Sequence, residues 1–241
     1  MENETSATGE NPYQPPEYPA SSIVSDEKYG IIQPNSVLRA YTREQLHGVW
    51  KKMAFAFFVI FLVYIPFYAG MVLNQIYPDV TAFTVIFWAL YIVAMIIGGP
   101  FYLGFAGYFL KRIRGEAIST KNIFDGFKQF GRSFVLMLLT GIFTVLWMLL
   151  LFVPGIIKSF SYSMAFFILH DNPEMKPNQA LKESCRMMKG YKWKLFCLEF
   201  SFIGWALLGI LTLGIGYFWL YPYMYMSIAN FYENLKTSQK N

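Results

Sequence analysis

The run from Ser133 to His170 is the feature that most limits how this chain can fold. It holds 38 residues, and Lys158 carries its only formal charge. A helix of about twenty apolar residues crosses a hydrocarbon core of about 30 Å. The run is therefore long enough to cross a membrane twice, and a soluble fold could not hide it together with the other apolar runs of the chain. It predicts a helical hairpin in a membrane, with a turn near its middle.

Composition extends this interpretation to the whole chain. Apolar residues make up 55% of the sequence and charged residues 15%, against roughly 25% charged residues in ordinary globular proteins. The sequence predicts an all-α membrane protein with about six transmembrane helices arranged as three hairpins. The expected spans are 53–76, 80–110, 133–153, 155–169, 195–213 and 217–232.

The charges between the spans predict an orientation. Lysines and arginines gather before the first span, between the second and third, between the fourth and fifth, and after the sixth. Cytoplasmic loops carry an excess of these residues. We therefore expect a multi-pass protein of the cell membrane with both termini in the cytoplasm.

The two ends of the chain differ from its middle. Residues 1–34 are rich in proline and carry six acidic residues, which predicts a disordered cytoplasmic tail. Residues 236–241 form a short second tail, and residues 35–235 are the expected membrane domain. The basic residues lie beside apolar spans, so we interpret them as signals of membrane orientation. The partner that they predict is anionic lipid rather than nucleic acid.

Three thirteen-residue segments repeat a pattern, at 36–48, 119–131 and 178–190. Each begins with Ser or Asn, which are favoured N-cap residues, and each ends in Gly, which is favoured after a helix. Each precedes a predicted hairpin. We expect three modules, at about 36–112, 119–170 and 178–235, in which a short cytoplasmic amphipathic helix leads into two spans.

These short helices carry basic side chains that could form a binding surface. The candidates for a surface that binds anionic lipid or a protein partner are Arg39, Arg43, Lys121, Lys128, Lys182, Arg186 and Lys189. A protein partner could also dock on the cytoplasmic face as a whole or on the tail. The alternative is that the helices only cap the bundle.

The middle of the long run suggests where its hairpin turns. Pro154 and Gly155 predict the turn, which places Lys158 one helical turn below it, close enough to reach the interface. Lys158 is then a structural anchor or a contact for an anionic substrate. Gly155, Ser159 and Ser163 recur at a spacing of four, which favours close helix packing over a polar path.

Glu199 is the second charge inside a predicted span. A carboxylate at that depth is costly unless it is protonated or paired. Lys192, Lys194 and the basic face of the preceding helix are its expected partners in an ion pair. The alternative is a relay for protons or cations.

No catalytic constellation is present in the sequence. The chain lacks GxSxG, HExxH, P-loop and GxGxxG motifs, and its two cysteines and two histidines have no metal-ligand spacing. "HDNPE" at 170–174 is interpreted as a turn. We therefore expect no enzyme activity, no cofactor and no metal.

Four segments carry a resemblance to a known family: "LRAYTREQLHGVW", "IFDGFKQF", the stretch from Leu146 to Met175, and the stretch from Ala180 to Tyr223. Over residues 36–235 the chain resembles an uncharacterised family of bacterial membrane proteins, labelled domain of unknown function 975. The resemblance implies an integral membrane protein and brings no activity, substrate or cofactor.

Three functional hypotheses follow. The favoured one is a non-enzymatic membrane or envelope protein that binds lipid or a partner. The alternative is a small transporter or permease with helices kinked at Pro66, Pro100 and Pro222, around Lys158 or Glu199. An enzyme acting on lipids within the membrane comes third, because it needs an activated nucleophile or a metal.

Overall fold

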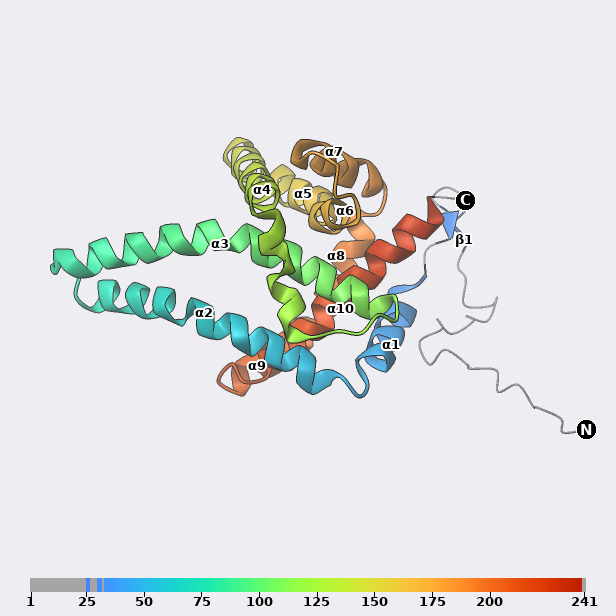
Figure 1. The fold of residues 1–241 in the computed structure, drawn as a ribbon. Helices are drawn as coiled ribbons and strands as arrows, with labels where there is room; N and C mark the ends of the chain where they lie inside the picture. Colours follow the sequence, from blue (N-terminus) through green and yellow to red (C-terminus); the bar gives the residue numbers. More distant parts are fainter. Residues whose placement is uncertain (1–24, 27–29, 32, 240–241) are drawn as a thin grey trace, which may run out of the picture.

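The computed structural model of the protein describes residues 25–26, 30–31 and 33–239, most of which are helical (Figure 1). Two short strands, β1 (Ser25–Asp26) and β2 (Gly30–Ile31), pair antiparallel. Residues 1–24 of the predicted tail lie outside the described residues. The helices are α1 (Asn35–Leu46), α2 (Trp50–Ile76), α3 (Thr81–Ile113), η2 (Thr120–Gln129), α4 (Phe130–Leu150), α5 (Phe152–Tyr162), α6 (Ala165–Asp171), α7 (Pro177–Met187), α8 (Lys192–Phe200), α9 (Ile203–Leu211) and α10 (Tyr217–Ser238).

Within the described residues, five helical stretches are long and apolar enough to cross a membrane. They are 50–76, 81–113, 120–150, 152–171 and 192–211, and their mean hydropathy lies between 1.5 and 2.3. The helix expected as a sixth span, α10, is not among them. Because α10 continues to Ser238, the predicted second tail is partly helical. Six spans in three hairpins therefore remains a prediction.

The composition of α10 reflects its position in the molecule. Its buried polar side chains face α1: Asn230 Nδ2 donates hydrogen bonds to Thr42 Oγ1 at 3.0 Å and to Gln45 Oε1 at 2.8 Å. Ser227 Oγ also lies 3.3 Å from Thr42 Oγ1. These bonds join two helices that are far apart in sequence. α10 is thus less apolar than the five spans because one of its faces pairs with polar groups.

The first corrected prediction is the position of the hairpin turn in the long run. α4 ends at Leu150 and α5 begins at Phe152, with only Leu151 extended between them. Pro154 lies in the first turn of α5, where its missing N–H costs no helical bond. A Cβ atom on Gly155 would lie 2.8 Å from the Cα of Met148. The turn therefore precedes Pro154-Gly155, and Gly155 lets α5 approach α4.

The second correction concerns the fourth and fifth spans, which are not continuous helices. At the break between α5 and α6, a side chain of α7 bonds to the free backbone groups. Ser184 Oγ accepts a hydrogen bond from the Met164 N–H at 3.2 Å and donates one to the Ser161 carbonyl at 2.8 Å. Between α8 and α9, the Ser201 carbonyl accepts from Arg39 Nη1 at 3.4 Å. Side chains thus satisfy backbone groups that an interrupted helix leaves free, which a membrane interior requires.

Helices occupy all three repeated segments, but their ends differ from the prediction. Ser119 is the N-cap of η2, and its N–H donates to Asn122 Oδ1 at 2.8 Å. The caps expected at Ser36 and Asn178 are wrong, because both residues lie inside α1 and α7. α7 begins at Pro177, which suits a first helical position.

Of the three glycines that end these segments, two follow a helix as predicted and one does not. Gly48 and Gly190 have φ of 76° and 90°, a left-handed conformation that favours glycine after a helix. Gly131 instead lies inside α4. η2 runs directly into α4, so the second segment has no break where one was expected.

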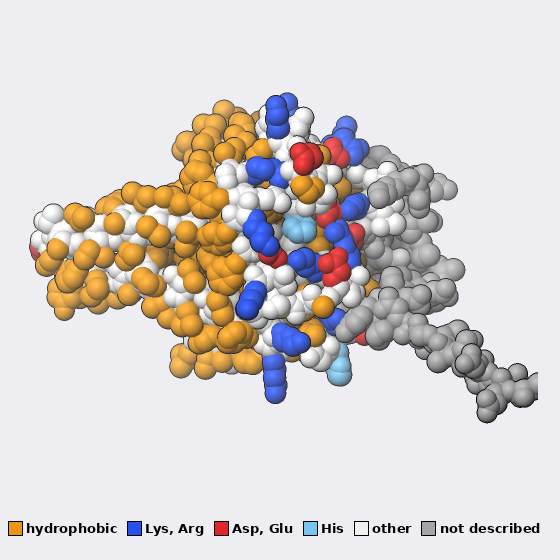
Figure 2. Space-filling view, viewed as in Figure 1, with side chains coloured by type: hydrophobic (Ala, Val, Ile, Leu, Met, Phe, Trp, Pro, Cys, Tyr) orange, Lys and Arg blue, Asp and Glu red, His pale blue; other side chains and the backbone are white. Residues whose placement is uncertain are grey.

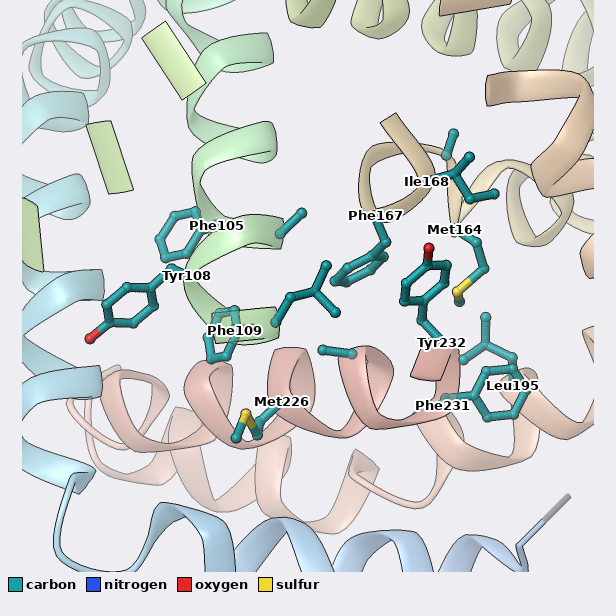
Figure 3. Packing of buried hydrophobic residues seen from close by; sticks show 14 of the residues in the cluster. Phe105, Tyr108, Phe109, Met164, Phe167, Ile168, Leu195, Met226, Phe231 and Tyr232 are labelled. Carbon is teal, nitrogen blue, oxygen red and sulfur yellow. The ribbon is translucent and has the colours of Figure 1, made fainter. Parts of the chain in front are cut away.

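The core lies where α3, α6, α8 and α10 meet. Figure 3 shows Phe109 of α3, Phe167 of α6 and Tyr232 of α10 in this region. The rings of Phe167 and Tyr232 stack with centroids 5.3 Å apart, and Phe109 and Tyr232 are almost fully buried. Such aromatic pairs contribute beyond their buried area.

Glycines bring η2 unusually close to α3. A Cβ atom on Gly104 would lie 1.8 Å from the Ile123 carbonyl oxygen, and one on Gly126 would lie 1.9 Å from the Pro100 carbonyl oxygen. No side chain fits between these backbones. The contact fixes the polar helix η2 against the C-terminal part of α3.

The molecule has an apolar end and a charged end. Figure 1 shows α2 and the first part of α3 as a long hairpin that projects from the other helices. In Figure 2, hydrophobic side chains cover that hairpin, whereas Lys, Arg, Asp and Glu side chains gather where α3, α6 and α10 finish. We call this second region the polar end, and it holds the ion pairs of Asp171 described next.

Candidate functional site

Asp171, the last residue of α6, is the centre of an ion-pair network at the polar end. Only 6% of its side chain is exposed. Its Oδ2 atom accepts hydrogen bonds from Arg114 Nη2 at 2.7 Å, from Tyr232 Oη at 3.0 Å, and from Lys236 Nζ. Arg114 Nη2 also lies 2.5 Å from Glu233 Oε1. The network joins the ends of α3, α6 and α10.

The ionisation of Arg114 follows from these contacts. Burial disfavours its charge, but the hydrogen bonds and charges of Asp171 and Glu233 raise the pKa of Arg114 above its ordinary value. The guanidinium therefore stays charged, and the acidic partners are held close to it.

A pocket of about 210 Å³ lies next to this network, between α3 and η2. Its lining comprises Leu103, Gly104, Gly107, Lys111, Asn122, Asp125, Gly126, Lys128, Gln129 and His170. Three of these donate to the Asp125 carboxylate: Lys128 Nζ at 2.7 Å, Asn122 Nδ2 at 2.9 Å and Lys111 Nζ at 3.3 Å. The pocket thus contains an anion, Asp125, inside a set of converging donors.

His170 connects the pocket to the network. A Cβ atom on Gly107 would lie 2.3 Å from His170 Nε2, so only glycine leaves room for the ring beside α3. His170 Nδ1 lies 3.6 Å from Asp171 Oδ1, which is longer than a hydrogen bond. Both atoms are buried and have no hydrogen-bond partner among the described residues.

Arg132 holds the loop that follows α6. Its Nη2 atom donates to the Asn172 carbonyl at 2.9 Å and to the Met175 carbonyl at 2.6 Å. The start of α4 is thereby tied to the "HDNPE" segment. That segment is a turn after Asp171, as interpreted from the sequence, but its first two residues belong to the site.

The predicted anchor Lys158 lies between α4 and α7. Its Nζ atom is 4.7 Å from the ring centroid of Trp147, a cation–π contact. Its charge also acts on the thiol of Cys185 in α7. Lys158 therefore lies beside Trp147 and near enough to α7 for its charge to act on Cys185, and its position near the outer edge of a membrane stays a prediction.

Glu199 lacks the ion pair that the sequence predicts. It is partly buried in α8, and among the described residues no lysine or arginine forms an ion pair with it. Neither Glu199 nor Lys158 lines the pocket beside η2. The structure does not bring these two candidate charges together with the polar site.

The seven basic candidates of the short helices differ in their exposure and in their ion-pair partners. Lys121, Lys182 and Lys189 are exposed and form no ion pair within the described part of the chain. Lys128 pairs with Asp125 at 2.7 Å, and Arg186 pairs with Glu183 at 2.5 Å. On α1, Arg43 is exposed and Arg39 is partly buried.

The serines of α5 use their hydroxyl groups locally. Ser159 Oγ donates to the Ile156 carbonyl at 2.7 Å, and Ser163 Oγ donates to the Phe160 carbonyl at 2.8 Å. Bonds of this kind keep a serine hydroxyl within its own helix. Within the residues that the structure describes, no group of three His, Cys, Asp or Glu side chains could hold a metal ion.

Within the described residues, the five apolar helical stretches and the charged end are compatible with a multi-pass membrane protein. The chain belongs to the family described as protein of unknown function (DUF975), whose profile matches residues 32–159 and 148–239. No curated protein and no solved structure matches the chain. Membership defines the family and leaves its activity open.

Proposed function

We propose that this bacterial protein is a non-enzymatic component of the cell membrane that binds anionic phospholipid headgroups through Lys121, Lys182 and Lys189. In this proposal all three short helices lie on the cytoplasmic side, together with both termini. We call these three lysines the lipid surface.

The observation that carries the proposal is the exposure of these three charges without an ion-pair partner among the residues that the structure describes. A lysine near an anionic membrane contributes about 1 kcal/mol to attraction. Lys128 and Arg186 contribute less, because an acidic neighbour already compensates each of them. The lipid surface therefore favours phosphatidylglycerol-like headgroups over zwitterionic ones.

The test is lipid binding by the full-length protein in maltoside detergent. Mixed micelles with fluorescent phosphatidylglycerol are titrated against the wild type and against a variant carrying Lys121→Gln, Lys182→Gln and Lys189→Gln. We expect the affinity of the variant to fall about tenfold or more.

The matched control carries Glu183→Gln and Arg186→Gln. It removes an exposed pair on α7 and leaves the net charge unchanged, so its lipid affinity should equal that of the wild type. If the triple variant also binds as the wild type does, the lipid surface is the wrong assignment, and a protein partner becomes the next hypothesis for these lysines.

A second candidate function, transport of protons or cations, is supported by Glu199. A carboxyl group inside an apolar stretch without a cation partner among the described residues is a functional candidate. Liposomes that hold the protein and a pH-sensitive dye test it. A pH gradient should decay faster with the wild type than with Glu199→Gln, and equal decay would exclude this role.

A further inference from the structure

We propose that the pocket between α3 and η2 binds one phosphate group, and that Asp125 takes the place of this group when no ligand is bound. The ligand class is a phosphomonoester or phosphodiester oxyanion. The proposal does not depend on the lipid surface, because different side chains carry it.

The geometry of the donors points to this site. Lys111 from α3 and Asn122 and Lys128 from η2 place three N–H donors within 3.3 Å of the two oxygens of one carboxylate. Two ammonium groups and an amide in this arrangement are donors that also suit a phosphate. Two elements supply them, so the arrangement depends on the glycine contact between α3 and η2.

The space beside the donors fits a small ligand. The pocket has a volume of about 210 Å³, whereas a buried water occupies about 30 Å³. A phosphate group and part of an attached glycerol can enter without displacing the helices. Gln129 and His170 also line the pocket and offer further polar atoms to the ester oxygens.

Asp125 must yield its donors for the ligand to bind. Its side chain is 33% exposed, so the carboxylate can rotate into water without losing hydration. The phosphate then replaces a carboxylate in contact with the same lysines. Asp125 therefore acts as an internal competitor that weakens phosphate binding and offsets one of the two positive charges when the pocket is empty.

Removing this competitor gives the sharpest test. Full-length protein in maltoside micelles, which contain no phosphate, is titrated with inorganic phosphate by calorimetry. Asp125→Asn preserves the shape of the side chain and removes its charge. We expect about tenfold tighter phosphate binding than in the wild type, because two lysines lose their anionic partner.

Lys128→Gln is the second variant, and it is expected to fold because 79% of the Lys128 side chain is exposed. It should bind phosphate several-fold more weakly than the wild type. Lys52→Gln, which changes an exposed lysine outside both the pocket lining and the lipid surface, should bind phosphate as the wild type does. Unchanged affinity in Lys128→Gln, or no gain in Asp125→Asn, overturns the proposal and leaves Asp125 as a structural ion-pair partner.

The same protein distinguishes the two sources of phosphate. If the ligand is a phospholipid headgroup, phosphatidylglycerol added to the micelles should compete with inorganic phosphate for the wild-type pocket. If the ligand is a soluble phosphate ester, glycerol phosphate should compete and the lipid should not. The variant of the lipid surface should keep phosphate binding with either source, because none of its three lysines lines the pocket, so the two proposals can fail separately.

Discussion

Arg114, just beyond the end of α3, donates a hydrogen bond of 2.7 Å to Asp171 at the end of α6. The two residues are 57 positions apart, and Asp171 also accepts from Lys236 of α10. One carboxylate thus joins three helix ends at the polar end. Paired charges in such a position hold a defined arrangement only while all partners are present.

Asp171→Asn should therefore destabilise the protein strongly. The substitution removes the negative charge that Arg114 and Lys236 share, and leaves Arg114 with Glu233 alone, in a site where only 6% of the Asp171 side chain is exposed. We expect a loss of about 3 kcal/mol in the free energy of unfolding, measured by denaturant titration in detergent. Glu183→Gln, which breaks an exposed pair on α7, should cost less than about 1 kcal/mol. Equal effects would contradict a special role for Asp171.

Gly104→Ala should disrupt the contact between α3 and η2. The new Cβ atom would lie 1.8 Å from the Ile123 carbonyl oxygen, so one helix must shift. We expect a loss of about 3 kcal/mol, visible as a lower midpoint of thermal unfolding. Gly141→Ala is the control, because nothing lies within 4 Å of its Cβ position. Inside α4 it should stabilise the helix by up to about 1 kcal/mol, and a loss there would argue against this explanation.

Glu199→Gln should leave stability unchanged within about 1 kcal/mol, because no ion pair is broken. The measured stability distinguishes the Glu199 of the structure, which is unpaired among the described residues, from the sequence prediction, in which Lys192 or Lys194 forms an ion pair with Glu199. If that pair existed, the substitution would cost about 3 kcal/mol, as for Asp171. The free energy of unfolding of the two variants, measured side by side, decides between these cases.

Much of the helical layout could be predicted from the sequence, because apolar run length depends only on local composition. The expected spans 53–76 and 80–110 agree with α2 and α3 within three residues at each end. The breaks after Tyr162 and Phe200 could not be predicted. Their free backbone groups bond to Ser184 and Arg39, and such pairings are set by tertiary packing.

The candidate site was missed for the same reason. Asp171 looked like part of a turn because its cationic partners lie 57 and 65 residues away. One local signal did exist: Asp171 is the acidic residue that directly follows the apolar run from Ser133 to His170. Lys111 and Asp125 are not among the sequence candidates, because the glycine contact that brings them together leaves no pattern in hydropathy.

The position of Lys158 leads to a prediction about Cys185. Burial raises the pKa of the Cys185 thiol, while the positive charges of Lys158 and Lys192 lower it and partly offset that effect. Lys158→Gln removes one of these charges, so the pKa should rise further and the thiolate fraction near neutral pH should fall. Because the thiolate is the reacting form, alkylation by a maleimide should become slower, and its rate profile should move to higher pH.

The measurement uses a Cys197→Ser background, in which Cys185 is the single cysteine of the chain. Lys189→Gln is the control, since no effect of Lys189 on this thiol is found. Superimposable profiles for Lys158→Gln and the control would place Lys158 away from α7.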